Sequence, residues 1–218
     1  MDINEALYTT RAMRRVSSDP VPDDIVKAMM DAAIRSPSGG NSQNWRWVTV
    51  ADRNTIVTIG DLYSDAWAQL NETFYKGKAE QARSSGDKAT VRVMNSAQWL
   101  ADNFAQVPLV VFPYHRNDPS GASIYPAVWS LMLSARSQGI GTCLTTVLGT
   151  FKHQEVADLL GVPVEKGWIN AAAVTCGYPL GKWGLAKRAP AHLVTYSETW
   201  GEPPTWTIDE PLWKPDDR

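Results

Sequence analysis

Residues 35–48 read RSPSGGNSQNWRWV, a polar bend with two glycines that directly precedes an aromatic segment. The glycine pair 39–40 is able to adopt positive φ and to bring backbone N–H groups close to a flat ligand. Ser38, Asn41 and Gln43 add neutral hydrogen-bonding groups, which suit a heterocycle with amide-like edges better than a bare phosphate. Taken alone, the stretch is also compatible with an ordinary connection between a helix and a strand.

The composition outside this bend is that of a globular protein. The chain has 218 residues, of which 44% are hydrophobic and 20% are charged, enough for one domain, 1–218, with a real core. A formal net charge of -2 creates no global basic field for nucleic acid or an anionic membrane. No long apolar run or signal-peptide core is present, so we expect a cytoplasmic protein that binds neither nucleic acid nor a membrane.

The cysteines and histidines do not form a metal-binding or nucleophilic pattern. Cys143 and Cys176 lie in the apolar stretches GTCLTT and AAAVTCGYP, where we expect buried free thiols. His115, His153 and His192 are scattered, and no CxxC pair accompanies them. We therefore expect no metal site and no catalytic triad.

Hydrophobic periodicity predicts alternating helices and strands with more helix than strand. The predicted helices cover about 3–15, with a capping box of Asp2 and Glu5, and then 22–35, most of 53–83, 95–106, 124–139 and 153–160. A flexible break is predicted over 84–92, and the predicted strands are 45–52, 109–114, 142–148 and 168–179. The Trp- and Pro-rich stretch from about 193 to 218 is either an arm on a second subunit or a tail on its own domain.

Three further polar features are weak signals when each is taken alone. Arg11, Arg14 and Arg15 share one side of the first predicted helix, where they would either grip a phosphate or form a solvated face. The loop GYPLGKWGLAKRAP, residues 177–190, is basic, and the stretch GIGTCLTTV ends a strand with two threonines. Neither a P-loop nor a GxGxxG fingerprint is present.

Taken together and in this order, these pieces resemble the nitroreductase family of FMN-dependent oxidoreductases. The resemblance rests on RAMRR, DPVPDDIVKAMMDAAIRSPSGGNSQNWRWV, GIGTCLTT and GYP…KRAP, and it runs from residue 3 to about 190. It implies an α+β sandwich with a central, mainly antiparallel sheet flanked by helices. It also implies an interdigitated homodimer with a swapped C-terminal arm, about 193–218, and two FMN molecules at the dimer interface, each contacted by both chains.

The resemblance assigns roles to the basic residues. Arg11 and Arg188 correspond to phosphate-binding arginines, and Lys187 is a helper beside Arg188. Arg14 corresponds to the basic residue that approaches N1 and O2 of the isoalloxazine ring, where positive charge favours the reduced flavin. Arg15 is adjacent and is either part of this group or a surface residue.

The remaining assignments concern the bend and the strand end. The bend corresponds to the loop that wraps FMN, partly from the other chain, and Thr145 and Thr146 correspond to the strand end near flavin N5. Many relatives carry Arg-Arg-Ser where this chain reads TRAM at residues 10–13, so one phosphate arginine and one serine are missing. The predicted cofactor site comprises Arg11, Ala12, Met13, Arg14, Arg15, Pro37, Ser38, Gly39, Gly40, Asn41, Gln43, Thr145, Thr146, Lys187 and Arg188.

The implied activity is ping-pong transfer from NADH or NADPH, through FMN, to a small electron-poor acceptor such as a nitroaromatic or a quinone. The alternatives are a flavin-binding or scaffold protein with little turnover, and a specialised relative such as a dehalogenase or a flavin-fragmenting or dehydrogenating enzyme. The Glu-x3-Tyr clamp of tyrosine deiodinases is absent, because no tyrosine lies four residues after Glu5, Glu72 or Glu80.

The segment that shapes substrate access is expected at about 61–83. Trp67, Phe74 and Tyr75 would either stack on an aromatic acceptor or pack in the core. The lysines and arginines of this segment would either attract the phosphates of NAD(P)H or form a solvated helical face.

Overall fold

The structure is a computed structural model that describes residues 1–215, so 216–218, the end of the predicted arm, lie outside the described residues. The chain divides into two compact units, which we describe separately. The larger unit is Ala12–Gly181, and the smaller unit combines Met1–Arg11 with Lys182–Arg218.

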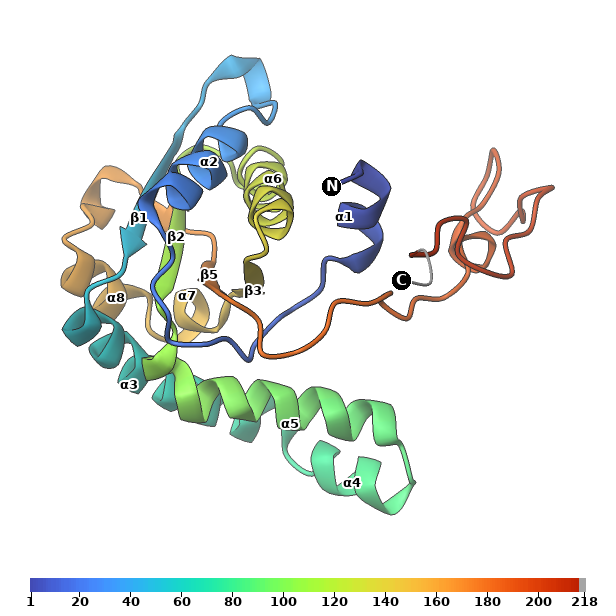
Figure 1. Cartoon of the computed structure of the whole chain (residues 1–218), viewed down its shortest axis with the longest axis horizontal. Helices are drawn as coiled ribbons and strands as arrows, with labels where there is room; N and C mark the ends of the chain where they lie inside the picture. Colours follow the sequence, from blue (N-terminus) through green and yellow to red (C-terminus); the bar gives the residue numbers. More distant parts are fainter. Residues whose placement is uncertain (216–218) are drawn as a thin grey trace. The chain divides into compact units, whose positions relative to one another are not determined.

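The larger unit is built on a five-stranded sheet in which every pair is antiparallel (Figure 1). The strand order is β1-β2-β5-β3, and β4 pairs with β2. The strands are β1 (Trp45–Val50), β2 (Leu109–His115), β3 (Gly141–Thr145), β4 (Ile169–Asn170) and β5 (Ala173–Gly177). Trp45 lies opposite His115, and Thr145 lies opposite Ala173. The predicted antiparallel sheet is therefore confirmed.

Helices cover both faces of this sheet, which makes the chain an α+β protein (Figure 1). Packed on one face are α2 (Asp23–Ala33) and α6 (Ile124–Ser137). Packed on the other are α3 (Arg53–Leu70), α5 (Lys88–Asn103), α7 (Val147–Phe151) and α8 (His153–Leu160). Successive residues of β2 alternate between the two cores. Val110 and Phe112 pack in the core beneath α3 and α5, while Leu109 and Val111 pack against α6. Burial on both faces explains why β2 reads as one unbroken apolar run.

A helical excursion connects β1 to β2. After α3, the chain continues through a π-helical turn, Asn71–Tyr75, and then through α4 (Lys78–Ser84) into α5. Helix α5 begins earlier than expected, because the Asp87 carboxylate accepts hydrogen bonds from the N–H groups of Ala89 and Thr90 at 3.0 and 3.1 Å. The flexible break predicted over 84–92 is therefore wrong, whereas the helical content of 53–83 is confirmed.

Two other predicted strands differ from the sequence-based expectations. The strand predicted over 142–148 ends at Thr145 because α7 begins at Val147, and the strand predicted over 168–179 is split into β4 and β5. Short 3-10 helices occupy Gly39–Asn41, Phe104–Gln106, Val164–Lys166 and Ala191–Val194. Within the part of the chain that the structure describes, no helix is long and apolar enough to cross a membrane.

The first helix is shorter than predicted. Helix α1 (Ile3–Thr9) ends before the arginines, and Thr10 has extended angles of φ -68 and ψ 122. The predicted common helical face of Arg11 and Arg14 is therefore wrong. The capping box is also wrong, because the Asp2 side chain makes no capping hydrogen bond.

The reason lies in residues 12–17, which we call the edge segment. This segment runs extended beside the sheet instead of continuing a helix: the N–H of Met13 donates to the Thr142 carbonyl at 2.8 Å, and Val16 forms an antiparallel bridge with Pro179. Pairing with strand residues requires extended backbone, so tertiary hydrogen bonds override local helical propensity here.

Two glycines permit the close approach of the edge segment. A Cβ atom added at Gly141 would lie 2.8 Å from Met13 Cβ, and one added at Gly177 would lie 2.8 Å from Val16 Cβ. Real Cβ atoms do not approach one another so closely. The edge segment therefore stays in place only while both strand ends carry glycine.

The smaller unit has little regular structure beyond α1 and the 3-10 turn Ala191–Val194. Within it, the rings of Tyr8 and Trp213 lie 5.7 Å apart. Large apolar side chains remain uncovered, since Trp200 is 91% exposed and Leu212 is 80% exposed. Apolar exposure on this scale is typical of a surface that another chain covers.

We predict that Gly177→Ala destabilises the larger unit. The new methyl group forces Val16 away from the sheet, which should cost about 1–3 kcal/mol of unfolding free energy. Urea unfolding followed by circular dichroism measures the change. Gly181→Ala is the matched control, because no atom lies within 4 Å of the added Cβ there. Equal stability of the two variants would contradict the proposed role of Gly177.

Candidate functional site

A cavity of about 620 Å³ opens in the larger unit beside the end of β3. It brings together one residue of the edge segment, the β3–α7 junction, and side chains from α3 and α5. Its lining includes Arg14, Tyr63, Trp67, Tyr75, Lys78, Thr90, Val93, Met94, Ala97, Cys143, Thr145, Thr146 and Phe151. We call it the Arg14 cavity.

Arg14 supplies the positive charge at one end of this cavity. Its position is fixed by its neighbour Met13, which is buried and hydrogen-bonded to β3. Arg14 is half-buried, and no carboxylate among the described residues forms an ion pair with it. Burial raises the pKa of the Cys143 thiol, and the charge of Arg14 acts on that pKa in the opposite direction. The cavity therefore holds a cation that is available to an electron-rich ligand.

A hydroxyl pair lies at the end of β3. The Tyr63 and Thr145 hydroxyl oxygens are 3.4 Å apart, and the N–H of Val147 donates to Thr145 Oγ1 at 3.4 Å. Burial is the main cause that raises the pKa of Tyr63, so its phenol stays neutral at physiological pH. The neighbouring Thr146 is exposed at the start of α7. These hydroxyl groups add neutral hydrogen-bonding groups to a part of the cavity whose other lining residues are mostly apolar.

The quoted bend forms a tight turn of left-handed backbone. Positive φ values occur at Gly40 (57°), Asn41 (51°) and Gln43 (48°). The expectation of positive φ is thus met at Gly40, whereas Gly39 is not among the residues with positive φ. The Asn41 N–H donates to the Ser38 carbonyl at 2.9 Å, and the Gln43 N–H donates to Ser38 Oγ at 3.1 Å. These bonds hold two non-glycine residues in a conformation that is costly elsewhere.

The bend does not line the Arg14 cavity. Pro37, Ser38 and Gly39 line a different cavity, of about 540 Å³, together with His115 and Arg116. The side chains of Asn41 and Gln43 are exposed and joined to each other by a hydrogen bond of 3.1 Å. Within one chain, the predicted site residues of the bend therefore lie in a different place from Arg14, Thr145 and Thr146.

The other predicted residues divide between the two units. Arg11 donates to the Lys182 carbonyl at 2.6 Å, and Arg188 donates to the Lys187 carbonyl at 2.9 Å, all within the smaller unit. In the larger unit, Ala12 is exposed, and the guanidinium of Arg15 lies over the Trp99 ring at 5.4 Å.

Several cavity residues were not singled out from the sequence. Tyr63, Met94 and Phe151 line the Arg14 cavity, but apolar periodicity identifies only a buried face, not the neighbours across it. Of the three aromatic candidates from 61–83, Trp67 and Tyr75 do line the cavity. Phe74 is 62% exposed and lines neither this cavity nor the cavity beside the bend.

Comparison with known proteins identifies relatives of the chain. The family model described as "Nitroreductase family" matches residues 7–178, which confirms the resemblance drawn from the motifs. The chain is 26% identical over 214 residues to a protein named "NADH dehydrogenase" from Thermus thermophilus, covering 89% of this chain and 95% of that protein.

Two solved structures share the fold. The FMN-dependent nitroreductase NfnB from Mycobacterium smegmatis, in complex with NADPH, matches with a TM-score of 0.60 and 20% identity, over 81% of this chain and 87% of that one. Oxidized iodotyrosine deiodinase bound to FMN and 3-iodo-L-tyrosine matches with a TM-score of 0.69 and 19% identity, over 86% of this chain and 95% of that one.

We predict that Tyr63→Phe reduces the loss of stability at alkaline pH. Because the folded state raises the Tyr63 pKa, the unfolded chain releases this proton first, above about pH 10, and stability falls as pH rises through that range. Burial of Tyr114 raises its pKa to about 12, so this residue also contributes to the loss of folding stability at alkaline pH. Urea midpoints at pH 8 and pH 11 measure the effect. A Tyr63→Phe variant that loses as much stability as the wild type contradicts the prediction.

Proposed function

The chain belongs to the nitroreductase family, and we propose that it is an FMN-dependent NAD(P)H oxidoreductase that reduces a small electron-poor acceptor, such as a nitroaromatic or a quinone. The observation that carries this proposal is Arg14, a half-buried cation without a carboxylate partner among the described residues, in a cavity of about 620 Å³. The relative named as an NADH dehydrogenase and the FMN-dependent structural neighbour support it.

The donor set of the Arg14 cavity fits a flavin ring. Arg14 suits the electron-rich pyrimidine edge, and the hydroxyls of Tyr63 and Thr145 supply neutral hydrogen bonds nearby. Val93 and Phe151 add an apolar wall. The volume lies within the range of about 300–1,000 Å³ that is typical of small-molecule and cofactor sites.

Bound FMN would supply the transfer of a hydride from a nicotinamide and onward to the acceptor. The chain itself supplies position, charge and exclusion of water. The edge segment fixes Arg14 in the wall of the cavity, where its charge would stabilise negative charge on a bound ring. Tyr63 orients the Thr145 hydroxyl, and the apolar wall keeps water from the reacting position. No side chain is assigned the role of a general base.

We also propose that the enzyme is a homodimer in which the bend of one chain completes the Arg14 cavity of the other. This proposal is supported by the exposed amides of Asn41 and Gln43 and by the separate location of the bend within one chain. The arm, about 193–218, would pack on the partner with its exposed apolar side chains. Arg11, Lys187 and Arg188 would bind the FMN phosphate.

The visible absorption spectrum of the purified protein, with the released chromophore identified, tests the cofactor. We expect a yellow protein that releases about one FMN per chain, is bleached by NADH or NADPH, and regains colour with menadione. A yellow protein that neither donor bleaches would be a flavin-binding protein with little turnover. A protein that stays colourless after FMN is added would refute the proposal.

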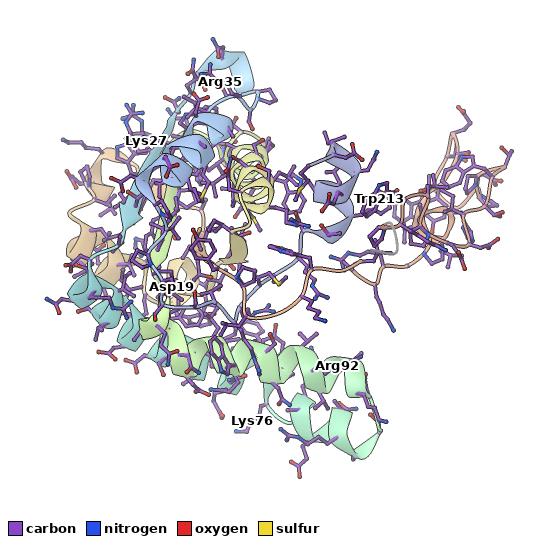
Figure 2. The ribbon with its side chains drawn as sticks, viewed as in Figure 1. Asp19, Lys27, Arg35, Lys76, Arg92 and Trp213 are labelled. Atoms are coloured by element: carbon purple, nitrogen blue, oxygen red, sulfur yellow. The ribbon has the colours of Figure 1, made fainter. Side chains whose placement is uncertain are left out.

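We predict that Arg14→Ala weakens FMN binding and slows its reduction. Loss of one charge-assisted hydrogen bond, about 1.5–3 kcal/mol, corresponds to a dissociation constant raised roughly 10- to 100-fold. Fluorescence titration of the apoprotein with FMN measures this. Arg92→Ala, at an exposed position of α5 (Figure 2), is the control. Unchanged FMN occupancy and an unchanged reduction rate in Arg14→Ala would exclude the assigned role.

We predict that the two halves of the shared site complement each other between chains. Gly40→Val disrupts the bend because a β-branched residue strongly disfavours a φ of 57°, and Arg14→Ala disrupts the cavity. Each variant alone should lose FMN, whereas the two chains refolded together should regain about a quarter of the sites, because only heterodimers hold one intact site. If the mixture holds no more FMN than the variants alone, the site is not shared.

A further inference from the structure

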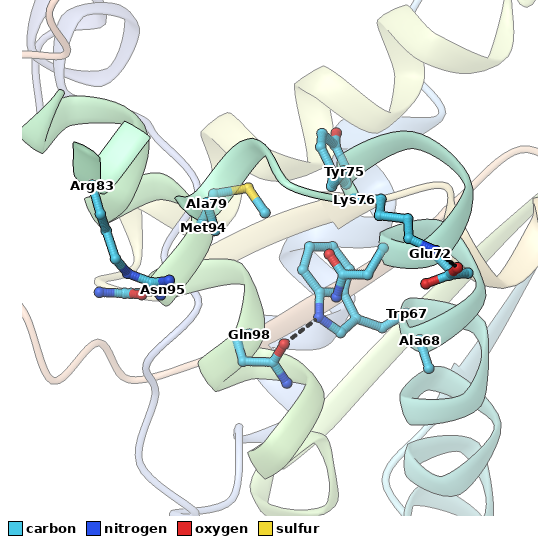
Figure 3. A pocket seen from close by; sticks show the side chains of 11 residues that line it. Trp67, Ala68, Glu72, Tyr75, Lys76, Ala79, Arg83, Met94, Asn95 and Gln98 are labelled. Carbon is cyan, nitrogen blue, oxygen red and sulfur yellow. Dashed lines mark hydrogen bonds and ion pairs between the residues drawn. The ribbon is translucent and has the colours of Figure 1, made fainter. Parts of the chain in front are cut away.

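Another cavity, of about 510 Å³, lies among α3, the π-helical turn, α4 and α5 (Figure 3). We call it the second cavity, and it shares no lining residue with the cavity beside the bend. Trp67, Tyr75 and Met94 line both this cavity and the Arg14 cavity, so the two cavities share a wall. Arg14, Thr145 and Thr146 do not line it. It is therefore a neighbour of the proposed flavin site and not a part of it.

The middle of this cavity suits a planar heterocycle. Trp67 is only 7% exposed, and its indole N–H donates to Gln98 Oε1 at 2.8 Å, which fixes the ring (Figure 3). The Tyr75 ring lies 6.2 Å from the Trp67 ring, between centroids. Asn71 and Asn95 add amide groups to the lining. Aromatic faces together with amides are the groups that bind a nucleobase by stacking and hydrogen bonding.

The charged side chains divide between the two ends of the cavity. Lys76 forms an ion pair with Glu72, four residues earlier, so its charge is largely neutralised. Arg83 forms no ion pair with any described residue. Figure 3 shows Arg83 beside Asn95, away from the paired Glu72 and Lys76. Arg83 is thus the cation of this cavity that is available to an anionic group.

We propose that this second cavity binds the adenosine end of the nicotinamide donor, and that Arg83 recognises the 2′-phosphate, so that the enzyme prefers NADPH to NADH. The inference rests on the proposed function. If the nicotinamide reacts with a flavin in the Arg14 cavity, the rest of the dinucleotide requires a place close by. The neighbouring cavity offers a stacking wall for adenine and a guanidinium for phosphate.

The position of Arg83 makes it a specificity residue and not a catalytic one. NADPH differs from NADH only by the 2′-phosphate, so a group that binds this phosphate affects one donor and not the other. Arg83 lies on α4 and is exposed, so its substitution should leave the fold intact. Lys78, the other nearby cation, lines the Arg14 cavity and lies 5.1 Å from the Tyr75 ring, so it does not serve the same position.

Direct binding to the FMN-loaded protein gives the first test. Calorimetric titrations compare 2′,5′-ADP, which carries the 2′-phosphate, with 5′-AMP, which lacks it. In the wild type, we expect 2′,5′-ADP to bind about tenfold more tightly, as is typical for one charge-assisted contact. Arg83→Met should abolish this difference and leave the affinity for 5′-AMP unchanged. Arg92→Met, which removes an exposed cation that does not line the cavity, should preserve the difference.

Equal affinity of the wild type for the two probes would overturn the proposal, as would a preference that survives in Arg83→Met. These titrations do not require turnover. They therefore test the second cavity even if the proposed oxidoreductase activity fails.

Steady-state kinetics gives the second test. Arg83→Met should raise KM for NADPH about tenfold, with KM for NADH and both kcat values unchanged. Reduced nicotinamide mononucleotide, which lacks the adenosine end, should be oxidised equally by wild type and variant. If both dinucleotides reduce the flavin and their ratio of kcat/KM does not depend on Arg83, this inference fails while the proposed function stands. If no donor reduces the flavin, the proposed function itself fails.

Discussion

The close contact of the edge segment with Gly141 and Gly177 is the constraint on which the candidate site depends. The segment reaches hydrogen-bonding distance of β3 because neither glycine carries a Cβ. This contact, and not helical propensity, decides where Arg14 lies. Its consequence is electrostatic, because the half-buried guanidinium faces a cavity and no carboxylate among the described residues neutralises it. Backbone packing therefore positions the positive charge that we assign to the proposed flavin site.

Sequence reasoning succeeded where one local pattern determines the structure. The strand in Trp45–Val50, the buried strand in Leu109–His115 and the helix ending before Gly139 each follow from periodicity and flanking residues. It failed where contacts between residues far apart in the sequence determine the local structure. Residues 12–17 have helix-compatible composition but pair with the sheet, and the Tyr63 hydroxyl meets Thr145 from a helix 82 residues away in sequence. No pattern within a short stretch of sequence shows which distant residue a side chain will contact.

The bend illustrates a different limit. Its glycines predicted left-handed backbone, but Asn41 and Gln43 adopt positive φ as well, at a cost of about 1 kcal/mol or more each. The hydrogen bonds that Ser38 accepts from the N–H groups of Asn41 and Gln43 stabilise this conformation and leave both side-chain amides exposed. Strain that persists on an exposed polar loop is typical of a binding element.

In the proposed ping-pong reaction, the wall shared by the two cavities separates the contacts of the donor from the position that donor and acceptor use in turn. In a ping-pong reaction, donor and acceptor occupy the same position beside the flavin, so tight contacts there would hold both equally. Contacts remote from the reacting position avoid this conflict, because they act on the donor alone. Trp67, fixed by Gln98, separates a reacting position lined by Arg14 from a cavity lined by Arg83. In the proposed reaction, donor affinity would be set on α4 and α5, while the cavity beside β3 would stay open to acceptors of varied shape.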